Sequence, residues 1–152
     1  MKPIIKVIIP AFNEQDAIAN VVNEIPKIVD EIIVVSNNST DNTELNAKNA
    51  GATVLKEHRK GYGFACLKGM DYIRNQKILP EIIVFLDGDY SDYPAQLIEI
   101  IDPIIKDDID FLIGGPILMG RGNRAHIVTP GVTVRGLLNI AALAGSPVSS
   151  YE

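Results

Sequence analysis

The sequence lacks several features that whole classes of protein require. Cys66 is the only cysteine, so an internal disulfide is excluded and a reducing compartment is expected. No apolar run approaches the roughly 20 residues of a membrane-spanning helix, and the longest run late in the chain covers only residues 137–144. The 14 basic residues are outnumbered by 19 acidic ones and form no stripe, which argues against a nucleic-acid-binding protein.

What the chain does contain is a regular alternation of apolar patterns. Hydrophobic residues make up 47% of its 152 residues, enough for one domain with a substantial core. Short β-branched runs predict strands at residues 4–9, 32–35, 52–55, 82–86 and 109–113. Apolar residues at helical spacing fall between these runs, and Asn13 is the expected cap of the first helix. This order predicts an α/β fold with a mostly parallel sheet covered by helices on both faces.

Polar loops follow three of the predicted strands, at residues 10–14, 36–41 and 87–92. Ligands of parallel sheets bind beyond the carboxyl ends of the strands, so these loops are expected to meet at one binding edge. A fourth loop, residues 57–63, is basic and contains glycines. Its backbone amides could receive an anion at the start of the next helix, although a solvated basic loop is at least as good an interpretation.

The sharpest chemical signal is the acidic triplet at residues 87–89, directly after the apolar run 82–86. Asp87 and Asp89 are two residues apart, so in extended backbone their carboxylates project to the same side, and Gly88 lets the chain turn between them. Their mutual repulsion needs an opposing charge. A hard cation such as Mg²⁺ or Mn²⁺ would supply it, with the remaining ligands coming from water and phosphates. The alternative is a solvated acidic turn.

Four ordered segments together resemble the family-2 glycosyltransferases. They are residues 7–14, 33–41, 61–63 and 87–89, which read VIIPAFNE, IVVSNNSTD, GYG and DGD. The segments are most similar to the branch that transfers sugars to dolichyl or polyprenyl phosphates. The resemblance spans residues 4 to about 113 and implies a GT-A fold. It also implies transfer of a sugar from a nucleotide diphosphate, with Mg²⁺ or Mn²⁺ at the Asp-x-Asp motif.

The resemblance also implies roles for individual residues. Asn37 would meet the edge of the base, Asp87 would face the ribose and the donor sugar, and Asp89 would ligate the metal. Asp87 and Asp89 would thus be the catalytic pair. The nucleotide-binding residues implied by the match are Pro10, Ala11, Glu14, Asn37, Asp87 and Gly88.

The second motif departs from the family pattern in a way that bears on the base. The family commonly reads Asp-Asp-Gly-Ser where this chain has residues 36–39, SNNS. Asn37 can accept a hydrogen bond through its carbonyl but without charge assistance. The single N3–H of uracil is easier to satisfy in this way than the N1–H and amine of guanine, so a UDP-sugar is favoured.

The composition changes after Gly114. The family continues with a Ser-Arg pair, whereas Pro116 stands here in place of the Arg, and the only acidic residue beyond Gly114 is Glu152. We therefore expect a nucleotide-sugar-binding core at residues 1–114 and an atypical or truncated acceptor-side tail at residues 115–152. Divergence, truncation and a change of reading frame all remain open as its cause.

The tail also bears on the acceptor. A hydroxyl acceptor needs a carboxylate base late in the domain, and only Glu152 is available. A phosphate acceptor is already largely ionised and needs cations instead. The candidates are Arg121, Arg124 and Arg135, although solvated loop arginines are an equally good interpretation.

The leading hypothesis is a cytoplasmic, metal-dependent glycosyltransferase that uses a nucleotide sugar and a polyprenyl or dolichyl phosphate at the membrane surface. One rival is a nucleotide-sugar-binding domain with little or no transferase activity, because the acceptor half is missing. A nucleotidyltransferase is a third hypothesis, but the chain has no glycine-rich loop bearing Arg or Lys after its first predicted strand.

Overall fold

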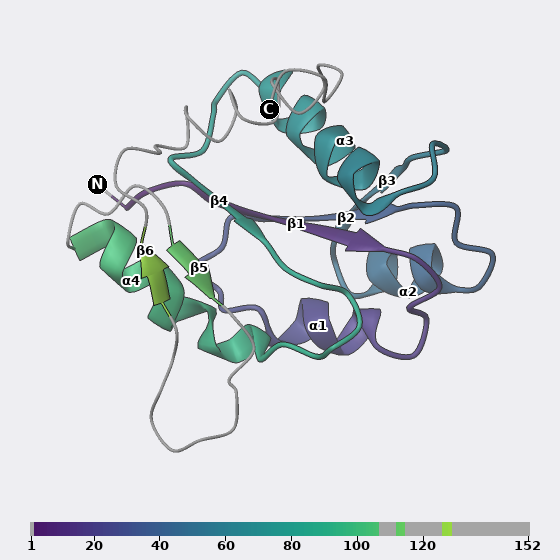
Figure 1. The fold of residues 1–152 in the computed structure, drawn as a ribbon, viewed down its shortest axis with the longest axis horizontal. Coiled ribbons are helices and arrows are strands. Elements are labelled where there is room, and N and C mark those ends of the chain that lie inside the picture. The colour runs from purple at the N-terminus through teal and green to yellow at the C-terminus, as the bar shows by residue number, and fades with distance from the viewer. Residues whose placement is uncertain (1, 107–111, 115–125, 129–152) are drawn as a thin grey trace, which may run out of the picture.

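The computed structural model describes residues 2–106, 112–114 and 126–128, and side chains are described within residues 2–106 (Figure 1). Its elements alternate between strands and helices, as predicted. In chain order they are β1 (Ile5–Ala11), α1 (Ile18–Glu24), β2 (Glu31–Ser36), α2 (Thr43–Asn49), β3 (Thr53–Lys56), α3 (Tyr62–Arg74), β4 (Ile82–Phe85), the 3₁₀ helix η1 (Pro94–Gln96), α4 (Leu97–Lys106), β5 (Leu112–Gly114) and β6 (His126–Val128).

The centre of the fold is a parallel four-stranded sheet in the order β3-β2-β1-β4. In the middle of β1, Ile8 pairs with Ile33 of β2 on one side and with Phe85 of β4 on the other. All seven residues of β1 are buried, which suits a strand covered on both faces. The α/β fold predicted from the alternation of patterns is therefore confirmed.

Helices cover both faces of this sheet, with α3 on one side and α1, α2 and α4 on the other (Figure 1). Alternate residues of β1 supply the two cores. Ile5, Val7 and Ile9 belong to the cluster that includes residues of α1, α2 and α4. Ile8 belongs to the cluster with Met70 of α3. Burying each such side chain is worth about 1.5–3 kcal/mol, so the two faces together hold the sheet in place.

The amino end of the sheet is closed by a buried polar network. Lys6 Nζ lies 2.7 Å from Glu31 Oε2, and both side chains are largely shielded from solvent. Glu31 also accepts hydrogen bonds from Tyr72 at 2.8 Å, Thr53 at 3.0 Å and Gln76 at 3.1 Å. Although burial raises the pKa of Glu31, these hydrogen bonds outweigh it and lower the pKa to about 2.

The first predicted helix cap is wrong. The helix begins at Ile18, with Ala17 in the cap position, whereas Asn13 lies in a turn with φ of 55°. Its side-chain Oδ1 accepts the Thr40 backbone N–H at 2.8 Å. Asn13 therefore joins the loops after β1 and β2 and does not cap a helix. Its side-chain oxygen accepts an N–H of the loop after β2, and not an N–H of the first turn of α1.

Two strand predictions also needed correction. The fourth strand was predicted at residues 82–86 but ends at Phe85, a residue that is 37% exposed. In the part of the chain that the structure describes, β5 pairs antiparallel with β6 and is not a member of the parallel sheet. Except for β5 and β6, the described residues end at 106, so most of the predicted tail lies outside them.

Candidate functional site

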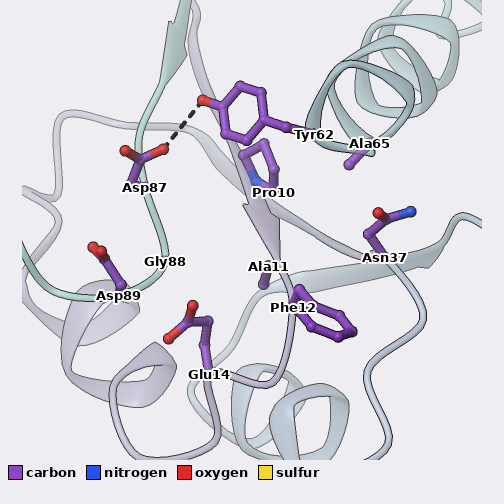
Figure 2. A pocket seen from close by; sticks show the side chains of 10 residues that line it. All are labelled: Pro10, Ala11, Phe12, Glu14, Asn37, Tyr62, Ala65, Asp87, Gly88 and Asp89. Atoms are coloured by element: carbon purple, nitrogen blue, oxygen red, sulfur yellow. Dashed lines mark hydrogen bonds between the residues drawn. The ribbon is translucent and has the colours of Figure 1, made fainter. Parts of the chain in front are cut away.

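A pocket of about 280 Å³ opens at the carboxyl edge of the sheet, where the loops after β1, β2 and β4 meet (Figure 2). Ala11 and Ser36 end β1 and β2 side by side, which brings the following loops together. The predicted meeting of three polar loops is therefore found. The pocket is lined by Pro10, Ala11, Phe12, Glu14, Asn37, Tyr62, Ala65, Asp87, Gly88 and Asp89.

Every predicted site residue within residues 2–106 lines this pocket. The set includes the acidic pair Asp87 and Asp89, Gly88 between them, and the predicted nucleotide-binding residues of the other two loops. Gly88 does not have a positive φ, so it is not needed for an unusual turn. A Cβ at Gly88 would lie 3.4 Å from the Pro10 carbonyl oxygen, which is about ordinary contact distance, so the loop after β4 runs against the end of β1.

Carboxylates gather on one side of the pocket (Figure 2). Asp89 Oδ1 accepts the Ser91 backbone N–H at 2.9 Å, which fixes the turn after β4. Burial, together with the nearby charges of Asp89 and Asp87, raises the pKa of the Glu14 carboxyl. The three carboxyl groups therefore concentrate negative charge at this end of the pocket.

Asp92 is a further acidic residue of this loop whose role was not anticipated individually from the sequence. Burial and the charge of Asp87 raise the pKa of its carboxyl, although the Asp87 backbone N–H also donates to it and opposes this effect. The only sequence signal for Asp92 was its place in the acidic loop 87–92. Its carboxyl supports the backbone at the start of the Asp-x-Asp turn.

The residues present fit a divalent cation only in part. Within residues 2–106 no group of three or more His, Cys, Asp or Glu side chains is arranged to hold a metal ion. One or two carboxylates are nevertheless enough for Mg²⁺ or Mn²⁺ when phosphate oxygens and water complete the coordination. The acidic end of the pocket therefore suits a cation that arrives together with a diphosphate.

Asn37 forms the opposite wall and is almost fully buried. Its Nδ2 donates to the backbone oxygens of Glu57 at 3.1 Å and Arg59 at 2.7 Å. Its Oδ1 accepts the Gly61 backbone N–H at 2.8 Å. Both amide protons are therefore committed to the loop between β3 and α3, and one acceptor position on Oδ1 remains for a ligand.

The basic loop 57–63 does not present all its charge to the pocket. Hydrogen bonds from the Arg59 side chain and backbone lower the pKa of the buried Glu57 to about 2. The Arg59 guanidinium also lies 4.6 Å from the centre of the Phe64 ring. Arg59 is thus engaged in an ion pair and a cation–π contact. The expectation that the backbone amides of this loop receive an anion stays a prediction.

Tyr62 is a pocket residue of the motif at residues 61–63, and no role for it was predicted from the sequence. It is the first residue of α3, and its hydroxyl donates to Asp87 Oδ1 at 3.1 Å (Figure 2). Tyr62 is 57% exposed, but partial burial and the negative charge of Asp87 raise the pKa of its hydroxyl, so the hydroxyl stays protonated and remains a donor. Its position between two glycines at a predicted helix start was the available signal.

Some expectations concern the part of the chain that is not described. The proposed acceptor residues Arg121, Arg124 and Arg135 lie outside the described residues, so their placement relative to the pocket stays a prediction. Among the helices that the structure describes, none has the length and apolar character needed to cross a membrane.

Comparison with known proteins shows which proteins this chain is similar to. The sequence profile named Glycosyl transferase family 2 matches residues 6–126. Protein RfbJ of Shigella flexneri is 36% identical over 72% of this chain and 83% of its own length. The UDP-N-acetylglucosamine–dolichyl-phosphate N-acetylglucosaminyltransferase of Methanococcus voltae is 30% identical over 93% of this chain, with 63% of its own length covered.

Solved structures give the same result for the fold. Glucosyl-3-phosphoglycerate synthase of Mycobacterium tuberculosis, in complex with Mn²⁺, UDP-glucose and phosphoglyceric acid, matches with a TM-score of 0.63 and 28% identity. The match covers 74% of this chain and 43% of that one. The chain thus spans less than half of the mycobacterial enzyme and under two thirds of the archaeal one.

Proposed function

Since the chain belongs to glycosyl transferase family 2, we propose that it binds a nucleotide-sugar donor with Mg²⁺ or Mn²⁺ and transfers the sugar to an acceptor. The observation that carries this proposal is the pocket at the carboxyl edge of the sheet. It brings the carboxylates of Asp87 and Asp89 to one end and the amide of Asn37 to the other. A nucleoside diphosphate has a matching polarity, with a base at one end and phosphates at the other.

We assign the acidic end to the diphosphate and its cation. Asp89 would hold the cation, and Asp87 would accept a hydrogen bond from the ribose or the sugar. When bound, the cation supplies Lewis-acid stabilisation of the negative charge on the leaving diphosphate. Relatives support this assignment, because the mycobacterial synthase was crystallised with Mn²⁺ and UDP-glucose and also with Mg²⁺ and UDP.

We assign the Asn37 wall, with Pro10 and Ala11, to the nucleoside. Asn37 has both amide protons committed to backbone carbonyls, so it can offer a base one acceptor and no donor. Uracil presents a single N3–H and fits this requirement. Guanine presents an N1–H and an amine, and one of these would lose a hydrogen bond on burial. A UDP-sugar is therefore the donor that this wall fits best.

The proposed acceptor is a polyprenyl or dolichyl phosphate. One relative supports this acceptor, because the Methanococcus voltae enzyme is named for dolichyl phosphate. A phosphate is ionised near neutral pH and needs no general base. Arg121, Arg124 and Arg135 remain the proposed cationic partners. A cytoplasmic position at the membrane surface follows from this acceptor and stays a prediction.

Donor binding without transfer is the second candidate, and Pro116 favours it because the family has an Arg at this position. The deciding experiment incubates the 152-residue chain with radiolabelled UDP-glucose or UDP-N-acetylglucosamine, Mn²⁺ and a polyprenyl phosphate. Metal-dependent label in the extracted lipid supports transfer. Calorimetric binding of UDP with Mn²⁺ but no lipid label supports binding alone, and absence of both contradicts the proposed function.

A further inference from the structure

We propose that Tyr62 is a positioning residue that couples the two ends of the pocket. Its hydroxyl holds Asp87 at the acidic end, and its backbone neighbour Gly61 is held by Asn37 at the opposite wall. The inference rests on the proposed function, because it assigns a role within the donor site. Tyr62 is not placed among the reacting groups; it acts through Asp87.

The first contact that carries the inference is the hydrogen bond from the Tyr62 hydroxyl to Asp87 Oδ1, 3.1 Å long. Within residues 2–106, this hydroxyl is the only side-chain donor to the Asp87 carboxylate. Asp87 otherwise lies among like charges, with Asp89 and Asp92 nearby. One neutral donor therefore fixes one carboxylate oxygen, and the second oxygen stays available to a ligand hydroxyl.

The second contact is the hydrogen bond from the Gly61 backbone N–H to Asn37 Oδ1, 2.8 Å long. Gly61 has a φ of 134°, a conformation that residues with a Cβ rarely adopt. It directly precedes Tyr62 and occupies the cap position of α3. The direction in which the Tyr62 side chain projects from α3 therefore depends on the backbone conformation of Gly61, which the hydrogen bond to Asn37 stabilises.

Asn37 is buried and makes two further hydrogen bonds to the same loop, through the carbonyls of Glu57 and Arg59. An aspartate in its place would keep the Gly61 contact but would point a carboxylate at two carbonyl oxygens. The loop would then move, and Tyr62 would move with it. A substitution of Asn37, at one end of the pocket, should for this reason alter the position of the Asp87 carboxylate at the other end.

The chain offers a matched control on the same helix. Tyr72 also donates its hydroxyl to a carboxylate, at 2.8 Å to Glu31 Oε1, but in the network at the amino end of the sheet. Tyr62→Phe and Tyr72→Phe thus make the same chemical change to α3. A merely structural role would lower the melting temperature in both variants and leave the affinity for UDP unchanged.

The test measures UDP affinity by calorimetry in the presence of Mn²⁺, and the melting temperature without ligand, for both variants. We expect Tyr62→Phe to weaken UDP binding about tenfold, the size of one charge-assisted hydrogen bond, with a melting temperature near that of the wild type. Tyr72→Phe should lower the melting temperature and leave the affinity unchanged. Equal affinities in Tyr62→Phe and the wild type would overturn the inference.

A double-mutant cycle tests the coupling. The effects of Asn37→Asp and Tyr62→Phe on UDP affinity should be non-additive. The fold-loss of affinity in the double variant should be smaller, by a factor of at least about three, than the product of the two single fold-losses. Asn37→Asp and Tyr72→Phe should be additive. Additivity in both pairs would overturn the coupling. If Asn37→Asp does not fold, the comparison of Tyr62→Phe with Tyr72→Phe still decides the role of Tyr62.

Failure of the inference and failure of the proposed function give different results. A wild-type protein that binds no UDP in the presence of Mn²⁺ overturns the proposed function, and the inference falls with it. A wild-type protein that binds UDP, with an unchanged Tyr62→Phe variant, overturns the inference alone.

Discussion

Gly69 of α3 lies against Ile8 of β1 so closely that a Cβ on Gly69 would come within 2.7 Å of Ile8 Cγ2. Helix α3, which places Tyr62 and Ala65 at the pocket, thus packs so close to the sheet that only glycine fits at position 69. Ile8 is fully buried and paired on both sides, so it cannot easily give way.

The first prediction follows from this approach. Gly69→Ala should lower the free energy of unfolding by about 1–3 kcal/mol, the usual cost of overpacking a core. It should also weaken UDP binding, because α3 would shift away from β1. Urea unfolding and calorimetry measure the two effects.

Gly63→Ala is the matched control, since Gly63 lies in the same helix with open space around its Cβ position. It should be neutral or stabilising by up to about 1 kcal/mol. Equal destabilisation by the two substitutions would show that the close approach is not what limits this helix.

The second prediction concerns pH and the network around Glu31. Its pKa in the folded protein, about 2, is below the ordinary value of 4.5. The contribution of Glu31 to stability is therefore present above about pH 4.5 and is lost as the pH falls toward 2. The shift corresponds to about 3 kcal/mol at most.

Lys6→Met should remove part of this contribution. We expect a loss of about 2 kcal/mol near neutral pH, less than the whole contribution of Glu31, because one partner of the pair is removed while three hydrogen bonds to Glu31 remain. The difference from the wild type should shrink as the pH falls. Lys2→Met, which breaks the exposed pair with Asp30, should cost under about 1 kcal/mol. Similar losses in both variants, measured by urea unfolding, would argue against a special role for the buried pair.

The third prediction concerns the base. UDP should bind about tenfold more tightly than GDP, because Asn37 can accept one hydrogen bond from a base and the second guanine donor would be left without a partner. A competition assay with a labelled UDP-sugar measures the ratio. Stronger competition by GDP would contradict the assignment of Asn37 to the base.

The edge of the sheet where the site lies was predictable from the sequence, and the reason is local. Runs such as residues 82–86 are apolar and β-branched, and the polar residues that follow them must fall where parallel strands end. The acidic pair Asp87 and Asp89 was therefore placed correctly without knowledge of any contact.

The walls of the pocket were harder to predict because their contacts join distant residues. Asn37 and Gly61 are 24 residues apart, and Tyr62 and Asp87 are 25 apart. Gly61 takes part in the first contact and directly precedes Tyr62 in the second, and no periodicity reveals its φ of 134°. Asn13 was predicted to cap a helix for the same reason: its actual partner, the Thr40 backbone N–H, lies 27 residues away in the loop after β2.

If this pocket binds a nucleoside diphosphate through a cation held by Asp89, removing the Asp89 charge should abolish the effect of that cation on UDP binding. Asp89→Asn removes the charge while its Oδ1 can still accept the Ser91 N–H, and Asp102→Asn removes a charge from the exposed pair with Lys106 on α4. UDP affinity is measured for the wild type and both variants, with Mn²⁺ and with a chelator. We expect Mn²⁺ to strengthen UDP binding at least about tenfold in the wild type and in Asp102→Asn but not in Asp89→Asn. UDP binding by the wild type that is unchanged by the chelator, or a full Mn²⁺ effect in Asp89→Asn, would contradict it.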